Sequence, residues 1–133
     1  MKNICKIIFP LFAILLFNGC GCDHPSKKGN VVEITTRGEF DEAIKCPKPV
    51  VAKLSAPWCG ACKVMDPIFK DASDKYDDVK FIHINVDNVG GVVEEFEVKG
   101  IPAFIYFKNG EQVKKIEGSM EQVDFEKTID SLK

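Results

Sequence analysis

The chain has 133 residues, of which 45% are hydrophobic, and its 18 Lys and Arg against 20 Asp and Glu give a formal net charge of −2. A chain of this length supplies one small hydrophobic core, which points to a single domain. The balanced charge excludes the basic footprint of a nucleic-acid-binding protein, so no nucleic acid is expected as a partner.

The N-terminus has the layout of a secretory signal. Lys2 and Lys6 precede an apolar run, residues 7–17, that is too short to span a bilayer comfortably. Residues 16–20, Leu-Phe-Asn-Gly-Cys, resemble a bacterial lipobox, although Phe17 and Asn18 depart from its usual residues. We expect residues 1–19 to be a lipoprotein-type signal peptide and Cys20 to be lipidated. Ordinary cleavage nearby and an uncleaved anchor are the alternatives.

Residues 20–30 are mostly polar and rich in small residues, which is typical of a tether. Residues 31–133 are expected to form the folded domain. The expected location is therefore extracytoplasmic, in the periplasm or on the outer face of a bacterial membrane. The lipidated N-terminus would hold the protein at that membrane.

From Val31 onward, strand and helix patterns alternate, as in an α/β domain. Residues 31–34 predict a short strand. Thr36 and Glu39 have the spacing of a capping box and open a helix that ends at Cys46-Pro47. Residues 50–54 predict a central strand, which is apolar except for Lys53.

Two thiols, Cys59 and Cys62, follow this strand at positions i and i+3. A helix is predicted after Cys59, with Pro67 inside it, because apolar residues recur at helical spacing at Ala61, Met65, Ile68, Phe69, Ala72 and Tyr76. At the helix N-terminus, free N–H groups and the helix dipole favour a thiolate on Cys59. The pair predicts redox chemistry. A structural disulfide or half a zinc site is the alternative, but the sequence offers no second ligand pair, so no metal is expected.

Four elements complete the domain: an alternating strand at 80–86, a short helix that carries Val92, Val93 and Phe96 and ends near Gly100, an apolar strand at 103–107 and a hairpin arm at 111–117. Asn109 and Gly110 predict the two-residue turn of that hairpin. Ser119 and Gln122 have the spacing of a second capping box, which would open a C-terminal helix.

Residues 58–63, Trp-Cys-Gly-Ala-Cys-Lys, resemble the active site of the thioredoxin family, where Trp-Cys-Gly-Pro-Cys-Lys is the commonest form. Further matching segments follow in the family's order, and they are Pro67, Val86-Asp87, Gly100-Ile101-Pro102, Phe107-Lys108-Asn109-Gly110 and Gly118. The resemblance covers about residues 31–133. It implies the thioredoxin fold, an α/β fold whose central mixed β-sheet is flanked by helices on both faces.

The resemblance also implies a thiol-disulfide oxidoreductase with no metal or organic cofactor. Cys59 would be the nucleophile and Cys62 the resolving thiol. The implied substrate surface comprises Trp58, Gly60, Ala61, Ile101, a cis-Pro102 and Gly118, with the backbone at Ile101 pairing with substrate as an added strand. A core role for Trp58 and an ordinary edge-strand role for Pro102 are the alternatives. The expected partners are disulfide-containing proteins or small disulfides and a redox partner that recharges a monomeric enzyme.

Lys53 departs from the family pattern. It lies six residues before Cys59, where thioredoxins usually carry a buried Asp that helps to deprotonate the second Cys. His83 stands where the family often has the Lys partner of that Asp. Lys53 is therefore a catalytic candidate with two roles open: a neutral amine could accept the proton of Cys62, and a charged one could stabilise its thiolate. A Lys53 that extends to solvent without any role is the third interpretation.

Two other functions stay open from the sequence. One is a dedicated electron shuttle in a maturation pathway such as cytochrome assembly. The other is a non-catalytic thioredoxin-fold binding module, which a failure to cycle between dithiol and disulfide would favour. Cys22 and Cys46 could pair in an oxidising compartment, and free thiols are the simpler interpretation.

Overall fold

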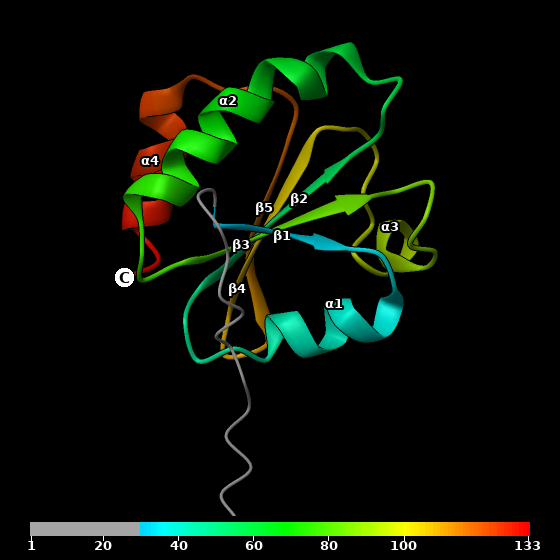
Figure 1. The fold of residues 1–133 in the computed structure, drawn as a ribbon, viewed down its shortest axis with the longest axis horizontal. Coiled ribbons are helices and arrows are strands. Elements are labelled where there is room, and N and C mark those ends of the chain that lie inside the picture. Colours follow the sequence, from blue (N-terminus) through cyan, green and yellow to red (C-terminus); the bar gives the residue numbers. More distant parts are fainter. Residues whose placement is uncertain (1–29) are drawn as a thin grey trace, which may run out of the picture.

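The computed structural model describes residues 30–133 (Figure 1). Its elements are β1 (Val31–Ile34), α1 (Arg37–Ile44), β2 (Val50–Ser55), α2 (Gly60–Lys75), β3 (Lys80–Asn85), α3 (Val92–Glu95), β4 (Ala103–Lys108), β5 (Glu111–Glu117) and α4 (Gln122–Asp130). The predicted order of strands and helices is confirmed. The predicted signal peptide, the predicted lipidation site Cys20, Cys22 and residues 21–29 of the predicted tether lie outside the described residues. Within residues 30–133, no helix is long and apolar enough to cross a membrane.

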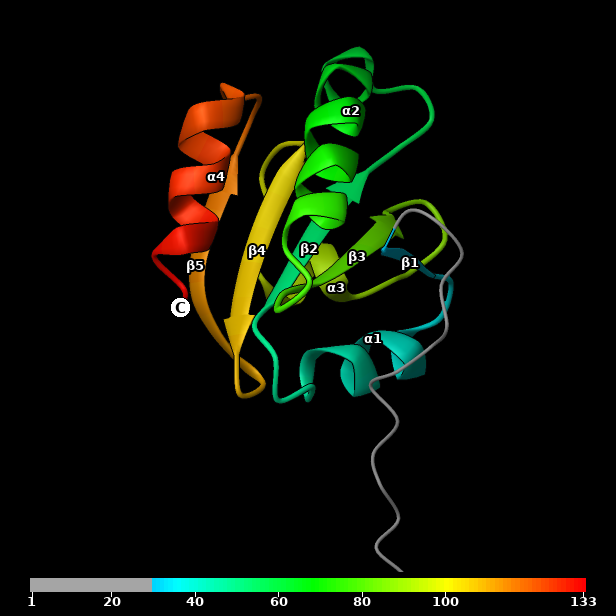
Figure 2. The ribbon, with the colours of Figure 1, turned by 60° about the vertical axis from the view of Figure 1, so that its left-hand side comes forward.

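The five strands form one mixed sheet in the order β1-β3-β2-β4-β5. Strand β3 pairs in parallel with β1 and β2, whereas β4 pairs antiparallel with β2 and β5. Helices cover both faces: α1 and α3 lie on one side of the sheet and α2 and α4 on the other (Figures 1 and 2). The central position of β2 was predicted from its apolar sequence, since a strand in the middle of a covered sheet is buried on both faces.

Alternate residues of β2 enter two different cores. Val50, Ala52 and Leu54 pack with residues of α1 and α3, and this side of the sheet is called the apolar face below. Val51 packs with residues of α2 and α4, on the side called the site face. Lys53 and Ser55 share the side of Val51 because side chains alternate along a strand.

Local sequence signals account for most element ends. Thr36 caps α1 with both hydrogen bonds of the predicted capping box, one of them from the Glu39 amide to the Thr36 hydroxyl at 3.2 Å. Asn109 and Gly110 both have positive φ, 54° and 83°, which is the backbone that a two-residue hairpin turn with the right twist requires.

The second predicted capping box, formed by Ser119 and Gln122, is wrong. Helix α4 begins two residues later than the pattern placed it, with Glu121 as an N-cap that makes no side-chain hydrogen bond. The Ser119 hydroxyl instead donates to the carbonyl of Ala61 at 3.5 Å, so tertiary contact with α2 replaces the local cap. Ala61 is also exposed and not on the buried stripe of α2, because Cys62 is the residue of the first turn that points inward.

Candidate active site

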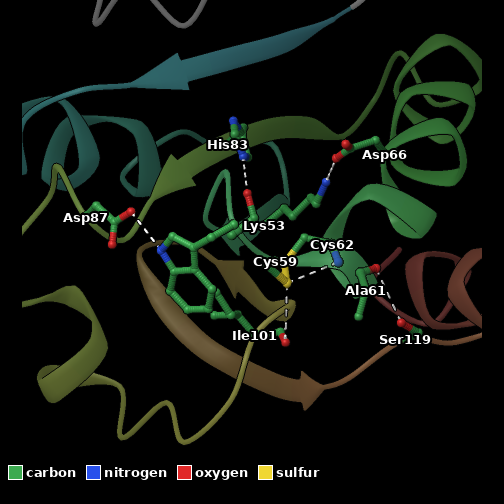
Figure 3. Close-up of a disulfide and its surroundings, with 11 residues drawn as sticks. Lys53, Cys59, Ala61, Cys62, Asp66, His83, Asp87, Ile101 and Ser119 are labelled. Carbon is green, nitrogen blue, oxygen red and sulfur yellow. Dashed lines mark hydrogen bonds and ion pairs between the residues drawn. A yellow bond between two sulfur atoms is a disulfide. The ribbon is translucent and has the colours of Figure 1, made fainter.

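Cys59 and Cys62 form a disulfide at the start of α2, with their Cα atoms 5.3 Å apart (Figure 3). Cys59 is the N-cap of the helix, and its Sγ accepts a hydrogen bond from the Cys62 amide at 3.1 Å. The predicted position of Cys59 at a helix N-terminus is thus confirmed. Residues 30–133 contain no group of three or more His, Cys, Asp or Glu side chains that could hold a metal ion. The two cysteines are instead bonded to each other, which is the oxidised state of a dithiol-disulfide couple.

The two cysteines have different surroundings. The Sγ of Cys59 lies 3.7 Å from the carbonyl oxygen of Ile101 and faces the surface formed around Trp58, whereas Cys62 is only 2% exposed. Trp58 is 70% exposed and is no core residue; its indole N–H donates to Asp87 at 3.1 Å. Cys59 is itself only 6% exposed, but its place at the N-cap beside Ile101 and the exposed Trp58 puts it nearer to an incoming disulfide than Cys62 is.

Backbone groups complete the outer surface. The Ile101–Pro102 peptide bond is cis, as the resemblance implied, and the amide of Gly118 donates to the Pro102 carbonyl at 2.7 Å. Gly118 has a φ of +92°, and Gly60 is exposed in the first turn of α2. A Cβ built on either glycine would meet no atom within 4 Å, so this part of the surface is open to a partner chain.

Lys53 is buried, with 2% exposure, so the interpretation that it extends to solvent is wrong. Its ammonium pairs with the carboxylate of Asp66 on α2 and lies 5.6 Å from the ring centroid of Phe69 (Figure 3). The side chain of Asp66 is 59% exposed, so one partner of this ion pair is buried and the other faces water. The pair ties the end of the Lys53 side chain, on β2, to the second turn of α2.

A second polar group, not expected from the sequence, lies beside Lys53. The hydroxyl of Ser55 is hydrogen-bonded to Nε2 of His83, and Nδ1 of His83 lies 2.6 Å from a carboxylate oxygen of Glu33. His83 is the register partner of Glu33 on β1 and of Lys53 on β2. The signal was present in the alternation of two strands, since Lys53, Ser55 and His83 all occupy site-face positions, but it required the strand register.

Two cavities open beside these groups. One, of about 170 Å³, is lined by Cys62, Ser55, His83 and Asp66 among others. The other, of about 390 Å³, is lined by Lys53, Glu33, His83 and Asp66 among others. His83 and Asp66 border both, so the buried thiol and the buried lysine are on neighbouring cavities with shared walls.

The sequence model of the thioredoxin family matches residues 31–131. Human thioredoxin is 38% identical over 104 residues, which cover 77% of this chain and 98% of the human protein. Rice thioredoxin H2-1 is 35% identical over 107 residues, 77% of each chain. Mitochondrial thioredoxin 3 of Saccharomyces cerevisiae, in its oxidised form, superposes with a TM-score of 0.70 and 33% identity over 76% of this chain and 94% of that one.

These matches define a protein-disulfide oxidoreductase with the thioredoxin fold. The chain belongs to the thioredoxin family. Membership favours an enzyme over the non-catalytic binding module.

Proposed function

We propose that this protein reduces or exchanges disulfides of proteins or small molecules outside the cytoplasm, while a lipidated Cys20 anchors it to a membrane. The observation that carries the redox part is the Cys59–Cys62 disulfide at the N-terminus of α2, beside an exposed Trp58. The location is supported by the signal-like residues 1–19 and the lipobox-like residues 16–20 alone. A separate redox partner would recharge the couple.

The reaction proceeds in two exchanges. The Cys59 thiolate attacks one sulfur of the substrate disulfide, and the other substrate sulfur leaves as a thiolate. The thiolate of Cys62 then attacks Cys59, the bond from Cys59 to the substrate breaks, and its electron pair leaves on the second substrate sulfur. The enzyme ends as the Cys59–Cys62 disulfide seen in the structure, and the substrate has gained two electrons and two protons.

The substrate docks on the outer surface. Its backbone pairs with that of Ile101 as an added strand, which brings the scissile sulfur toward Cys59, 3.7 Å from the Ile101 carbonyl. Trp58, held by Asp87, supplies apolar contact area, and Gly60, Ala61 and Gly118 keep the approach free of side chains.

Lys53 influences Cys62 indirectly, by offsetting the negative charge of Asp66. Asp66 follows Cys62 by one helical turn, so their side chains lie on the same side of α2 and border one cavity. A carboxylate near Cys62 would oppose its thiolate, and the ammonium of Lys53 offsets that charge. In this proposal Lys53 is charged and favours the reactive state of Cys62 indirectly.

Insulin reduction with dithiothreitol as the donor tests the redox part. The full chain should precipitate insulin as a disulfide reductase does, and Cys59→Ser should abolish the activity. A protein that cycles fully against glutathione but leaves insulin intact would favour the dedicated electron shuttle.

Fractionation of a bacterial host that expresses the full chain tests the location. The protein should partition into membranes, because the several acyl chains of a lipoprotein anchor stably where one chain does not. Cys20→Ser should release the protein or block its processing. An unmodified N-terminus beyond Cys20, found by mass spectrometry, would contradict the proposal.

A further inference from the structure

The proposed reaction requires Cys62 to lose a proton before it attacks Cys59, and the inference below rests on that reaction. Cys62 is 2% exposed, so its thiol has almost no direct contact with bulk water. A carboxylate would be the usual acceptor in this family, but the position holds Lys53, whose ammonium is engaged by Asp66. An ammonium has no lone pair with which to accept a proton. The proton must leave by another route.

The cavity beside Cys62 offers one. Its volume of about 170 Å³ is enough for several water molecules, each of which occupies roughly 30 Å³ in the liquid. Ser55 and His83 line the same cavity, and Ser55 is 6% exposed. From Ser55 a continuous hydrogen-bonded chain runs through His83 to Glu33, whose side chain is 67% exposed. The chain therefore joins the cavity that Cys62 lines to solvent at the exposed carboxylate of Glu33.

The partners fix the direction of the hydrogen bonds. An ionised Glu33 can only accept, so Nδ1 of a neutral His83 carries the hydrogen and Nε2 carries the lone pair. Nε2 then accepts from the hydroxyl of Ser55. Carboxylate, imidazole and hydroxyl are thus in the order in which a catalytic triad removes a proton from its nucleophile. Here the hydroxyl faces a cavity that it shares with a thiol.

We propose that Ser55, His83 and Glu33 form a proton relay that activates Cys62 for resolution of the mixed disulfide. The Cys62 proton crosses the cavity to Ser55 Oγ while the hydroxyl proton of Ser55 moves to Nε2 of His83. The Cys62 sulfur bonds to Cys59, the Cys59–substrate bond breaks, and the departing substrate sulfur takes its electron pair and a proton from water. Glu33 stabilises the imidazolium, which then returns its proton to solvent.

Other charged groups surround His83 and modulate the relay. Across the two cavities these are Glu33 from β1, Lys53 from β2, and Lys63, Asp66 and Lys70 from α2. Lys53 and Asp66 neutralise each other in their ion pair, which leaves Glu33 as the anion in direct contact with the ring. The relay needs the neutral imidazole, because only its Nε2 lone pair can take the proton of Ser55.

The test separates the two chemical steps. The reduced full chain is mixed with a substoichiometric amount of the aromatic disulfide DTNB, quenched in acid and analysed by mass spectrometry of the Cys59 peptide. Growth of the Cys59 adduct reports the first attack, and its decay reports resolution by Cys62. Ser55→Ala and His83→Gln should leave the growth unchanged and slow the decay at least tenfold at pH 7. Peptide mapping keeps the other thiols of the chain apart from this signal.

The pH profile distinguishes a relay from packing. In the parent protein the decay rate should rise with pH as the imidazole of His83 loses its proton and becomes able to accept another. In His83→Gln the rise should move toward the range of free thiols, near about pH 8.5. Glu33→Gln should slow the decay, because the imidazole loses the carboxylate that holds its Nδ1 hydrogen.

Ser73→Ala is the matched control, since Ser73 is also buried and its hydroxyl bonds only locally, to the Lys70 carbonyl at 2.7 Å. Normal decay in Ser55→Ala and His83→Gln would overturn the relay, as would an equal slowing in Ser73→Ala. Slow decay in Asp66→Asn with no effect of Ser55→Ala would assign the step to the helix carboxylate instead. If no adduct forms on Cys59 in the parent, both the relay and the proposed function are wrong.

Discussion

The two faces of the sheet differ in what they bury. The apolar face packs hydrophobic side chains alone, among them Phe40, Phe96 and Phe107, whose rings meet edge to face. The site face buries or half-buries Lys53, Ser55, His83 and the hydroxyl of Tyr106 among the apolar residues of α2 and α4. One face holds the fold together, and the other combines that task with chemistry.

The cost of this arrangement falls on the site face. A buried polar group is tolerated only where a partner meets it, and Lys53 and Ser55 have such partners in Asp66 and His83. The catalytic pair lies at the start of α2, a few residues after the end of β2, so the strand that carries Lys53 and Ser55 also leads into the loop before Cys59. Substitutions on the apolar face should therefore change stability alone, whereas substitutions on the site face should change activity, stability or both.

The cysteines offer the sharpest contrast. Cys59→Ser should lower activity by roughly three orders of magnitude, because a serine hydroxyl is no substitute for a thiolate at neutral pH. Cys62→Ser should trap a mixed disulfide on Cys59, visible by mass spectrometry. Cys46, a free thiol buried on the apolar face, is the control: Cys46→Ala should cost about 1 kcal/mol of stability and leave the activity per folded molecule unchanged. Trapping on Cys46 would reverse the assignment.

The Lys53–Asp66 pair should respond asymmetrically. Asp66→Ala leaves a buried ammonium without its partner and should cost about 2 kcal/mol in urea unfolding. Lys53→Met replaces the ammonium beside Phe69 with an apolar group and leaves Asp66, which faces water, without its partner. Its cost in stability should therefore stay below about 0.5 kcal/mol. The double variant should resemble Lys53→Met. Equal costs for the two single variants would mean that the burial of Lys53 has no energetic consequence.

In the activity assay, Lys53→Met should slow release of the mixed disulfide at neutral pH and leave the first attack by Cys59 unchanged. The reason is that Asp66 then faces Cys62 without the compensating ammonium. Single-turnover rates equal to those of the parent protein would leave Lys53 as a purely structural residue.

Trp58 should contribute to substrate capture and not to the fold. Trp58→Ala removes an exposed apolar surface, and a loss of about 1.4 kcal/mol of binding corresponds to a tenfold lower kcat/KM, chiefly through KM. Asp87→Asn should have a smaller effect in the same direction, because it weakens the hydrogen bond that holds the indole. Val123 on α4, which is 73% exposed, is the matched control, and Val123→Ala should be silent. An unchanged KM in Trp58→Ala would remove the indole from the substrate surface.

The fold and the disulfide could be predicted because their signals are local. Alternating or continuous apolar residues located the strands, and Asn109-Gly110 located the hairpin turn. Cys59 at the start of a helical pattern located the reactive pair. Position along the chain does not reveal register, however. The meeting of Glu33 with His83 and of Lys53 with Asp66 depends on how β1, β3 and α2 align, and the same is true of Ser119, whose contact with Ala61 replaced a local cap.

Within the described residues, Tyr106 on the site face buries a polar group that no hydrogen bond compensates. Its hydroxyl is buried and has no hydrogen-bond partner among residues 30–133, and burial raises the pKa of the phenol well above its ordinary value. The native state therefore keeps the phenol neutral, while the unfolded chain ionises as the pH passes about 10. The stability that depends on this group is complete below pH 10 and falls as the pH rises further.

Tyr106→Phe removes the orphan hydroxyl and the alkaline penalty together. We expect a gain of about 1 kcal/mol in urea unfolding at pH 7 and a smaller decline above about pH 10. Tyr76→Phe is the control, because Tyr76 is also buried but its hydroxyl is not a buried group without a partner, so its loss should bring no gain at pH 7. Equal declines of the parent and Tyr106→Phe above pH 10 would show that Tyr106 reaches water. A gain in stability would mean that the site face buries a destabilising polar group even at Tyr106, which has no part in the proposed chemistry, whereas the apolar face, within the described residues, buries none.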